Sequence, residues 1–157
     1  MHFRTVCLTI ALVATSMAVS AADNSLGTWK RNIAKSKSNT PVANPYKSQT
    51  TVREASDGGV KVTSTGERMD GTATNATYTL KYDGVAVPVT GGASFDSMSV
   101  KQIDANTFTN ATKKTGGKYQ TTGRTVVSKD GKTMTVTQKG TDADGKPISF
   151  TIVYDKQ

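Results

Sequence analysis

The stretch from Asp130 to Thr137 reads Asp-Gly-Lys-Thr-Met-Thr-Val-Thr, so a turn dipeptide leads directly into a run of alternating residues. The Asp-Gly pair supplies the positive φ angles that tight hairpins need. Met134 and Val136 alternate with threonine, and a period of two places both on one face of a β-strand. The stretch therefore predicts a strand that starts at a hairpin and has one apolar face.

The same combination of turn and alternating strand recurs along the chain. Further turns are predicted at Asp57-Gly58-Gly59, Asp70-Gly71, Asp83-Gly84, Asp104-Ala105-Asn106, Thr115-Gly116-Gly117 and Asp144-Gly145. The intervals show alternation and no sustained apolar period of 3.6 residues, which a helix would require. The sequence predicts an all-β fold in which antiparallel strands follow one another as an up-and-down meander.

We expect this meander to close into a barrel of about eight to ten strands, because closure leaves no exposed sheet edge. The segment from Ile148 to Tyr154 is apolar on both faces for part of its length. It should lie centrally in the sheet or pair with the first strand. The interval from Asp83 to Asp104 contains Pro88 and predicts two short strands with a bend. The predicted core comprises Trp29, Val60, Val62, Leu80, Val100, Met134, Val136 and Ile152.

Residues 1–21 are predicted to be a signal peptide. A short start containing Arg4 precedes an apolar run from Val6 to Val19, and Val19-Ser20-Ala21 forms a cleavage site of small residues. The run is shorter than the ~20 apolar residues of a membrane-spanning helix. We therefore expect a protein in the periplasm or outside the cell without a stable membrane anchor, and residues 22–157 should form a single domain.

The residue types left after cleavage restrict the chemistry. The chain has one histidine and one cysteine, His2 and Cys7, and both lie in the predicted signal peptide. Catalysis by Ser-His-Asp or Cys-His groups and metal sites built on imidazole or thiolate are therefore excluded for the mature chain. We expect no enzyme activity, no cofactor and no metal.

The formal net charge of +8 favours anionic partners. The lysines are spread along the chain, with the densest group at Lys113, Lys114 and Lys118. No series of aromatic residues accompanies them to stack on bases, so we expect no nucleic-acid partner.

Three segments resemble the calycin superfamily, which comprises lipocalins and fatty-acid-binding proteins. They are Gly27-Thr28-Trp29-Lys30, the stretch from Arg124 to Thr137, and the terminal Val153-Tyr154-Asp155-Lys156. More closely, the whole mature chain resembles small exported bacterial lipocalin-like proteins. The resemblance implies a barrel with a ligand cavity, with Gly27 and Trp29 at its closed end and an arginine stacked on the indole.

The resemblance carries over unevenly. In the fatty-acid-binding branch an arginine two residues before the terminal-strand tyrosine holds the ligand carboxylate, and here Ile152 takes that position while Tyr154 is kept. Arg124 resembles the second carboxylate-binding arginine of that branch. The region from Arg31 to Tyr46 contains two prolines and reads as a loop with at most one helical turn, in place of a helical lid.

We therefore expect an exported, monomeric binding protein for a small hydrophobic or amphipathic molecule, which could be anionic and fatty-acid-like. Arg124 shares a strand face with Val126, which the pattern predicts to point inward. Three alternatives remain for Arg124: it anchors the head of a ligand, it stacks on Trp29, or it points outward into solvent. The predicted ligand-binding residues are Arg124, Tyr154, Tyr78, Leu80, Met98, Phe108, Met134 and Phe150.

The competing function is a protein-binding barrel, such as an exported inhibitor or envelope-stress factor, with a filled interior. Such a protein would act through its loops. An open interior favours the ligand carrier, and a filled interior favours the protein-binding barrel.

Overall fold

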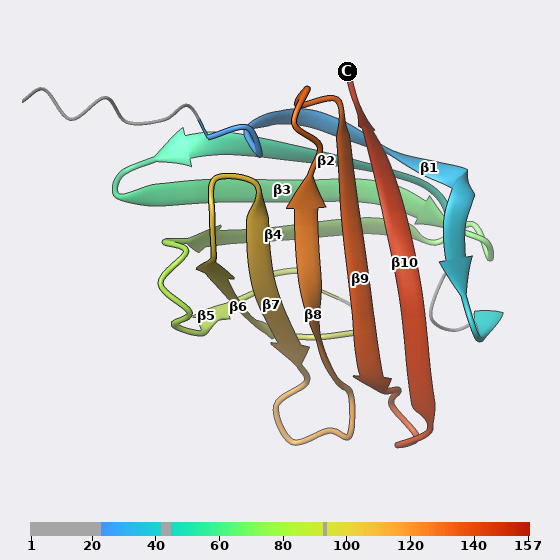
Figure 1. Cartoon of the computed structure of the whole chain (residues 1–157). Helices are drawn as coiled ribbons and strands as arrows, with labels where there is room; N and C mark the ends of the chain where they lie inside the picture. Colours follow the sequence, from blue (N-terminus) through green and yellow to red (C-terminus); the bar gives the residue numbers. More distant parts are fainter. Residues whose placement is uncertain (1–22, 42–44, 93) are drawn as a thin grey trace, which may run out of the picture.

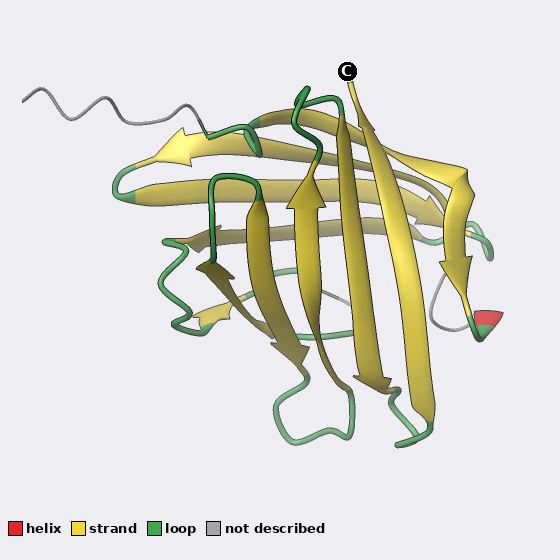
Figure 2. Cartoon of the chain, in the orientation of Figure 1, coloured by secondary structure: helices red, strands yellow, loops and turns green. Residues whose placement is uncertain are grey.

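The computed structural model describes residues 23–41, 45–92 and 94–157, so the predicted signal peptide lies outside the described residues. Strands and loops make up almost all of this part of the chain (Figure 2). The strands are β1 (Gly27–Ser38), β2 (Tyr46–Ser56), β3 (Gly59–Arg68), β4 (Ala73–Leu80), β5 (Val87–Pro88), β6 (Ser97–Gln102), β7 (Thr107–Lys113), β8 (Gln120–Val127), β9 (Thr133–Thr141) and β10 (Pro147–Lys156). Within the described ranges no helix is long and apolar enough to cross a membrane.

All ten strands belong to one antiparallel sheet with the order β4-β3-β2-β1-β10-β9-β8-β7-β6-β5. Consecutive strands are neighbours except for β4 and β5, which form the two edges of the sheet, and one additional pairing joins β1 to β10. In Figure 1 the strands β7 to β10 run steeply across the long strands β2 and β3, so the sheet curls round an interior. The predicted all-β meander, with its last strand paired to its first, is confirmed.

The barrel closes between β4 and the chain that follows β5. Thr77 of β4 and Thr90 exchange two backbone hydrogen bonds, with N–O distances of 2.9 and 3.0 Å. The contact is an isolated bridge, so these two hydrogen bonds make up the backbone pairing across this gap among the described residues. The predicted pair of short strands between Asp83 and Asp104 corresponds to β5 and β6.

Strand β1 bends, and it joins the two parts of the sheet, which are β2 to β4 on one side and β5 to β10 on the other. Its first half pairs with both β2 and β10, and its pairing with β10 shifts between Asn32 and Lys37. The hydroxyl of Ser36 donates to the Asn32 carbonyl at 2.7 Å and accepts from the Val153 amide at 3.1 Å, which holds the bulge in place. A loop starting at Arg31 was therefore the wrong prediction, because a bulge carries the strand on to Ser38.

The closed end of the barrel contains the apolar core. Trp29 is fully buried, and its indole N–H donates to the Ser25 carbonyl at 2.8 Å. Around it pack Val60, Val62, Leu80, Val100, Phe108, Val127, Met134 and Tyr154. The cation over the indole is Lys156, with its Nζ atom 5.0 Å from the ring centroid, in place of the arginine that the resemblance implied. Val136 and Ile152, also predicted for the core, pack against this cluster while remaining partly exposed.

Candidate functional site

The barrel encloses a cavity of about 190 Å³ beside the apolar core. Its walls come from both parts of the sheet, with Arg31, Gln49 and Ser64 on one side and Thr112 and Gln138 on the other. The chain after β5 contributes Gly91, Gly92, Ser94 and Phe95. The interior is therefore apolar at the Trp29 end and mixed in polarity where it is hollow.

Arg31 is the charged residue that β1 turns into this cavity. It lies two residues beyond Trp29, and alternation along a strand places both side chains on the inner face. Only 5% of Arg31 is exposed. Its guanidinium carbon lies 5.0 Å from the ring centroid of Tyr46, so an aromatic face covers one side of the cation.

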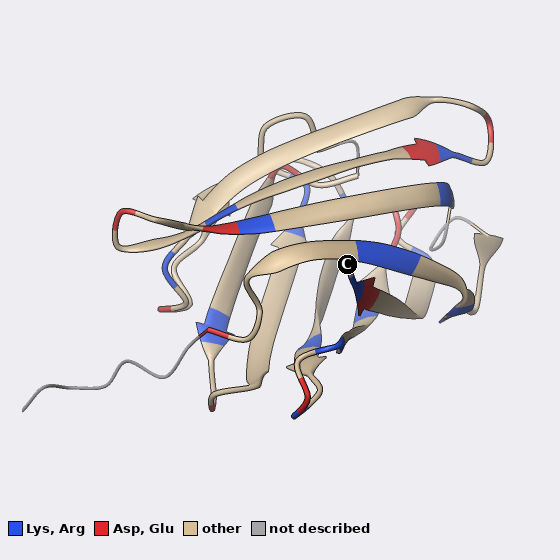
Figure 3. Ribbon diagram, turned by 90° about the horizontal axis from the view of Figure 1, so that it is seen from above, with Lys and Arg blue, Asp and Glu red and all other residues tan. Residues whose placement is uncertain are grey.

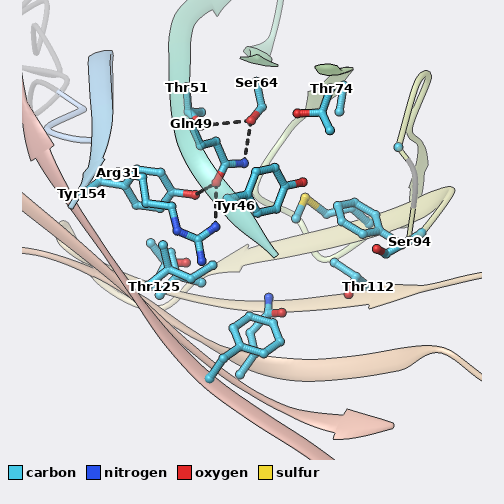
Figure 4. Close-up of a pocket in the computed structure, with 18 of the residues that line it drawn as sticks. Arg31, Tyr46, Gln49, Thr51, Ser64, Thr74, Ser94, Thr112, Thr125 and Tyr154 are labelled. Carbon is cyan, nitrogen blue, oxygen red and sulfur yellow. Dashed lines mark hydrogen bonds between the residues drawn. The ribbon is translucent and has the colours of Figure 1, made fainter. Parts of the chain in front are cut away.

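Gln49 connects the groups around Arg31 (Figure 4). Its side-chain oxygen accepts from Nη1 of Arg31 at 2.9 Å and from the Tyr154 hydroxyl at 3.1 Å. Its amide nitrogen donates to the Ser64 hydroxyl at 2.9 Å. Arg31 and Tyr154 are also direct partners in the pairing of β1 with β10. Four strands thus fix one cluster, which holds the guanidinium in a defined orientation.

Burial changes the proton affinities in this cluster. Loss of solvent lowers the pKa of the Arg31 guanidinium, while the nearby Tyr154 and Tyr46 oppose that change. Loss of solvent raises the pKa of Tyr154 to about 12. It also raises the pKa of Tyr78 on the facing strand β4. At neutral pH both phenols are therefore neutral hydrogen-bonding groups, and the arginine keeps its charge.

A second arginine lines the same cavity. Arg53 donates from Nη2 to the Tyr82 hydroxyl at 2.8 Å, and its buried Nε atom has no hydrogen-bond partner among the described residues. The described residues that line the cavity include these two guanidinium groups and no carboxylate. The lining therefore carries positive charge, which a small anion would complement.

Five of the eight predicted ligand-binding residues line the cavity, and they are Tyr78, Met98, Met134, Phe150 and Tyr154. Leu80 and Phe108 do not. Each is 1% exposed and packs in the closed-end core, where the Phe108 ring lies 4.8 Å from that of Tyr82. Both side chains point inward as predicted, but they lie in the packed core near Trp29 and not in the cavity wall.

Arg124 points away from the interior, so the prediction of an inward side chain is wrong. It is exposed, and it contributes to a depression on the outer surface together with Lys101 and Lys139. The neighbouring Val127 is 1% exposed and Val126 is 40% exposed. The inward residues of β8 are therefore the odd-numbered ones, and not the even-numbered ones that were predicted. Two adjacent valines left both registers open in the sequence, and the inward register brings Thr125 to the cavity.

The other surface charges are spread over several strands and turns (Figure 3). The printed ion pairs in the described chain join Lys35 to Asp155, Lys47 to Glu67 and Lys114 to Asp96, and all three involve exposed side chains. Such pairs contribute little to stability. The charge that distinguishes the cavity is therefore the buried arginine and not the surface lysines.

Four residues that line the cavity were not predicted from the sequence, and they are Arg31, Gln49, Thr112 and Gln138. Arg31 could have been found, because period two from the buried Trp29 already places it inward. Gln138 could also have been found, because it lies two residues beyond Val136 on the predicted apolar face. Gln49 and Thr112 lie in strands without strict alternation, so no pattern separated their inward positions from outward ones.

The comparisons with known proteins found solved structures of similar shape. No protein-family model matches the chain, and no curated protein sequence matches it significantly. A solved structure described as EF1p2_mFAP2b bound to DFHBI is similar with a TM-score of 0.47 and 11% sequence identity, covering 87% of this chain and 97% of the other. The function must therefore be argued from the cavity itself.

Proposed function

We propose that this protein is an exported carrier that binds a compact amphipathic anion inside its barrel. The head of the anion lies against Arg31 and Tyr154, and the carbon frame lies among Met98, Met134 and Phe150. The protein acts by binding and not by catalysis, in the periplasm or outside the cell. The predicted signal peptide, residues 1–21, supports this location.

The observation that carries the proposal is the buried guanidinium of Arg31 in a cavity wall without a described carboxylate. A carboxylate taken out of water needs a charge-assisted partner, because an unpaired buried charge is costly. The Arg31 side chain is held by Gln49 at 2.9 Å, so little side-chain order has to be gained on binding. The Tyr154 hydroxyl lies in the same cluster.

The size of the cavity favours a compact ligand. Its volume of about 190 Å³ lies below the ~300 to 1,000 Å³ of most small-molecule pockets. A medium-chain carboxylate such as decanoate is therefore a better probe than a long-chain fatty acid. The hollow interior also favours the carrier over a protein-binding barrel, for which a filled interior was expected.

The proposal can be tested with two arginine variants that differ in the side of the sheet they affect. Arg31→Met removes the inward guanidinium, and Arg124→Met removes an outward one as the matched control. Decanoate and the neutral 1-decanol would be titrated calorimetrically into each delipidated protein. We expect Arg31→Met to weaken decanoate binding by about 2 to 4 kcal/mol, the scale for leaving one member of a buried charge pair unmatched.

The alcohol should lose much less affinity in Arg31→Met, and Arg124→Met should bind both ligands like the parent protein. Equal losses for acid and alcohol would show that Arg31 does not hold the head group. If the delipidated parent binds neither ligand, the protein-binding barrel becomes the better explanation. Export is tested separately, since N-terminal sequencing of the protein from its own cells should find Ala22 or Asp23 first.

A further inference from the structure

The cavity has a second polar wall, opposite the Arg31 cluster, on strands β7, β8 and β9. Asn110, Thr112, Thr121 and Gln138 are between 1% and 7% exposed. Asn110 and Gln138 both pair in register with Gly123, whose missing side chain leaves room for them to meet. Buried polar groups of this kind are placed by their hydrogen bonds, so the wall has a defined arrangement.

The hydrogen bonds in this wall form a chain with one direction. The Thr121 hydroxyl donates to Oε1 of Gln138 at 2.7 Å, which uses its only hydrogen. Thr112, 2.7 Å from Thr121, must therefore donate to it. Gln138 in turn donates from Nε2 to Oδ1 of Asn110 at 2.6 Å. Asn110 donates from Nδ2 to Oγ1 of Thr125 at 2.8 Å.

The chain ends in unused donors that line the cavity. Thr125 accepts from Asn110, and no described residue accepts the hydrogen of its hydroxyl. Gln138 donates one of its two amide hydrogens to Asn110 and keeps the other. Both Thr125 and Gln138 line the cavity. The wall therefore offers hydrogen-bond donors to a ligand and no cation.

We infer that Thr125 and Gln138 form a second subsite, which takes a neutral oxygen acceptor on the carbon frame of the bound anion. This inference rests on the proposed function, since it requires the carboxylate at Arg31. The acceptor is a carbonyl, ether or hydroxyl oxygen, because the wall supplies donors but lacks the charge that a second carboxylate would need. The ligand class is therefore a compact oxo- or hydroxy-carboxylate and not an unsubstituted fatty acid.

The test compares decanoate with decanoates that carry one ketone, at carbon 5, 7 or 9, in calorimetric titrations of the delipidated protein. At least one ketone should bind about tenfold more tightly than decanoate, the scale of one or two neutral hydrogen bonds. Thr125→Val should remove this gain, so that the variant binds the ketone and decanoate with equal affinity. Thr125→Ser, which keeps the hydroxyl, should retain it.

Equal affinity of the parent protein for decanoate and all three ketones would overturn the second subsite. So would an equal loss of decanoate and ketone binding in Thr125→Val. The ligand comparison in the parent protein stands even if Thr125→Val fails to fold. Decanoate binding that depends on Arg31 without any preference for a ketone rejects the second subsite alone, whereas no binding of any of these acids rejects the proposed function with it.

Discussion

The closed end and the hollow half of the barrel are built from the same strands but differ in the side chains that they turn inward. At the closed end Trp29, Val62, Leu80 and Phe108 are no more than 1% exposed and fill the interior. In the hollow half polar side chains stand among apolar ones, and Arg31 is the most deeply buried charge among the residues that line the cavity. One region is packed and the other encloses a cavity.

Individual strands change from one kind of lining to the other within a single step of two residues. In β1 this step leads from Trp29 to Arg31, and in β3 it leads from Val62 to Ser64. Alternation decides which face a residue occupies, while its position along the strand decides whether it fills the core or lines the cavity. The packed core and the cavity wall are therefore largely separate sets of inward residues, and Met134 and Tyr154 belong to both.

The largest expected effect is on the packed end. Replacing Trp29 with alanine should lower the free energy of unfolding by about 3 to 5 kcal/mol, as for other large aromatic residues removed from a core. The variant also loses the indole bond to Ser25 at 2.8 Å. Urea unfolding measures the change, and Trp29→Phe should cost less because it keeps a ring in the site. A loss under 1 kcal/mol would contradict the central place of Trp29.

Tyr154 links the two regions, and its titration should be visible in stability. Burial raises its pKa to about 12 from the ordinary value of 10.0. The protonated phenol is favoured in the folded chain, so its contribution is complete below pH 10 and is lost as the pH rises from 10 to 12. Ionisation of Tyr154 over this window should lower the free energy of unfolding by about 2 to 3 kcal/mol.

Urea unfolding at several pH values, in the parent and in Tyr154→Phe, isolates this contribution from the titration of lysines. The variant should have a shallower fall above pH 10, offset by a constant loss from the missing bond to Gln49. Parallel curves for the two proteins would mean that the phenol ionises equally in the folded and unfolded chains.

The wall of the hollow half should tolerate no added methyl group at Gly123. A Cβ atom there would lie 1.9 Å from the Thr137 carbonyl oxygen and 2.8 Å from the Cα of Gln138. We expect Gly123→Ala to cost about 1 to 3 kcal/mol, the range for overpacking. Gly117→Ala is the control, since that turn glycine has no positive φ and its added Cβ would first meet the flexible side chain of Lys114, at 3.1 Å. Urea unfolding measures both variants, and equal losses of unfolding free energy would show that the wall rearranges to accept the methyl group.

The architecture was predictable because its signals are local. Asp-Gly turns and period-two alternation predicted the meander, and the doubly apolar last strand predicted the pairing of β10 with β1. These patterns act between near neighbours and need no knowledge of distant contacts. They failed at β1, where the bulge after Asn32 keeps the chain in the sheet although its sequence reads as a loop.

The site was harder to predict because it depends on contacts between distant segments. Gln49 meets Tyr154 across 105 residues of sequence, and no local pattern announces that contact. Arg124 was placed inward because two adjacent valines fit either register of β8, and packing against β7 and β9 decided between them. The resemblance pointed to Arg124 on β8, which lies on the outer surface, whereas Arg31 on β1 lines the cavity.

The smallest expected effect is at the outer rim of the closed end. Lys156 is exposed, with Nζ 5.0 Å from the centroid of the Trp29 ring and 3.3 Å from the Asn24 carbonyl oxygen. Lys156→Met keeps the aliphatic stem over the indole and removes the charge, so it should cost about 0.5 to 1 kcal/mol, the size of an exposed cation–π contact. Lys156→Arg should keep most of that stabilisation, because a guanidinium also binds an aromatic face.

Urea unfolding of the three proteins measures both differences. A Lys156→Met variant as stable as the parent would mean that packing and the hydrogen bond to Ser25 alone hold the indole. Neither variant should alter decanoate binding, because the contact lies outside the packed core that separates Lys156 from the cavity.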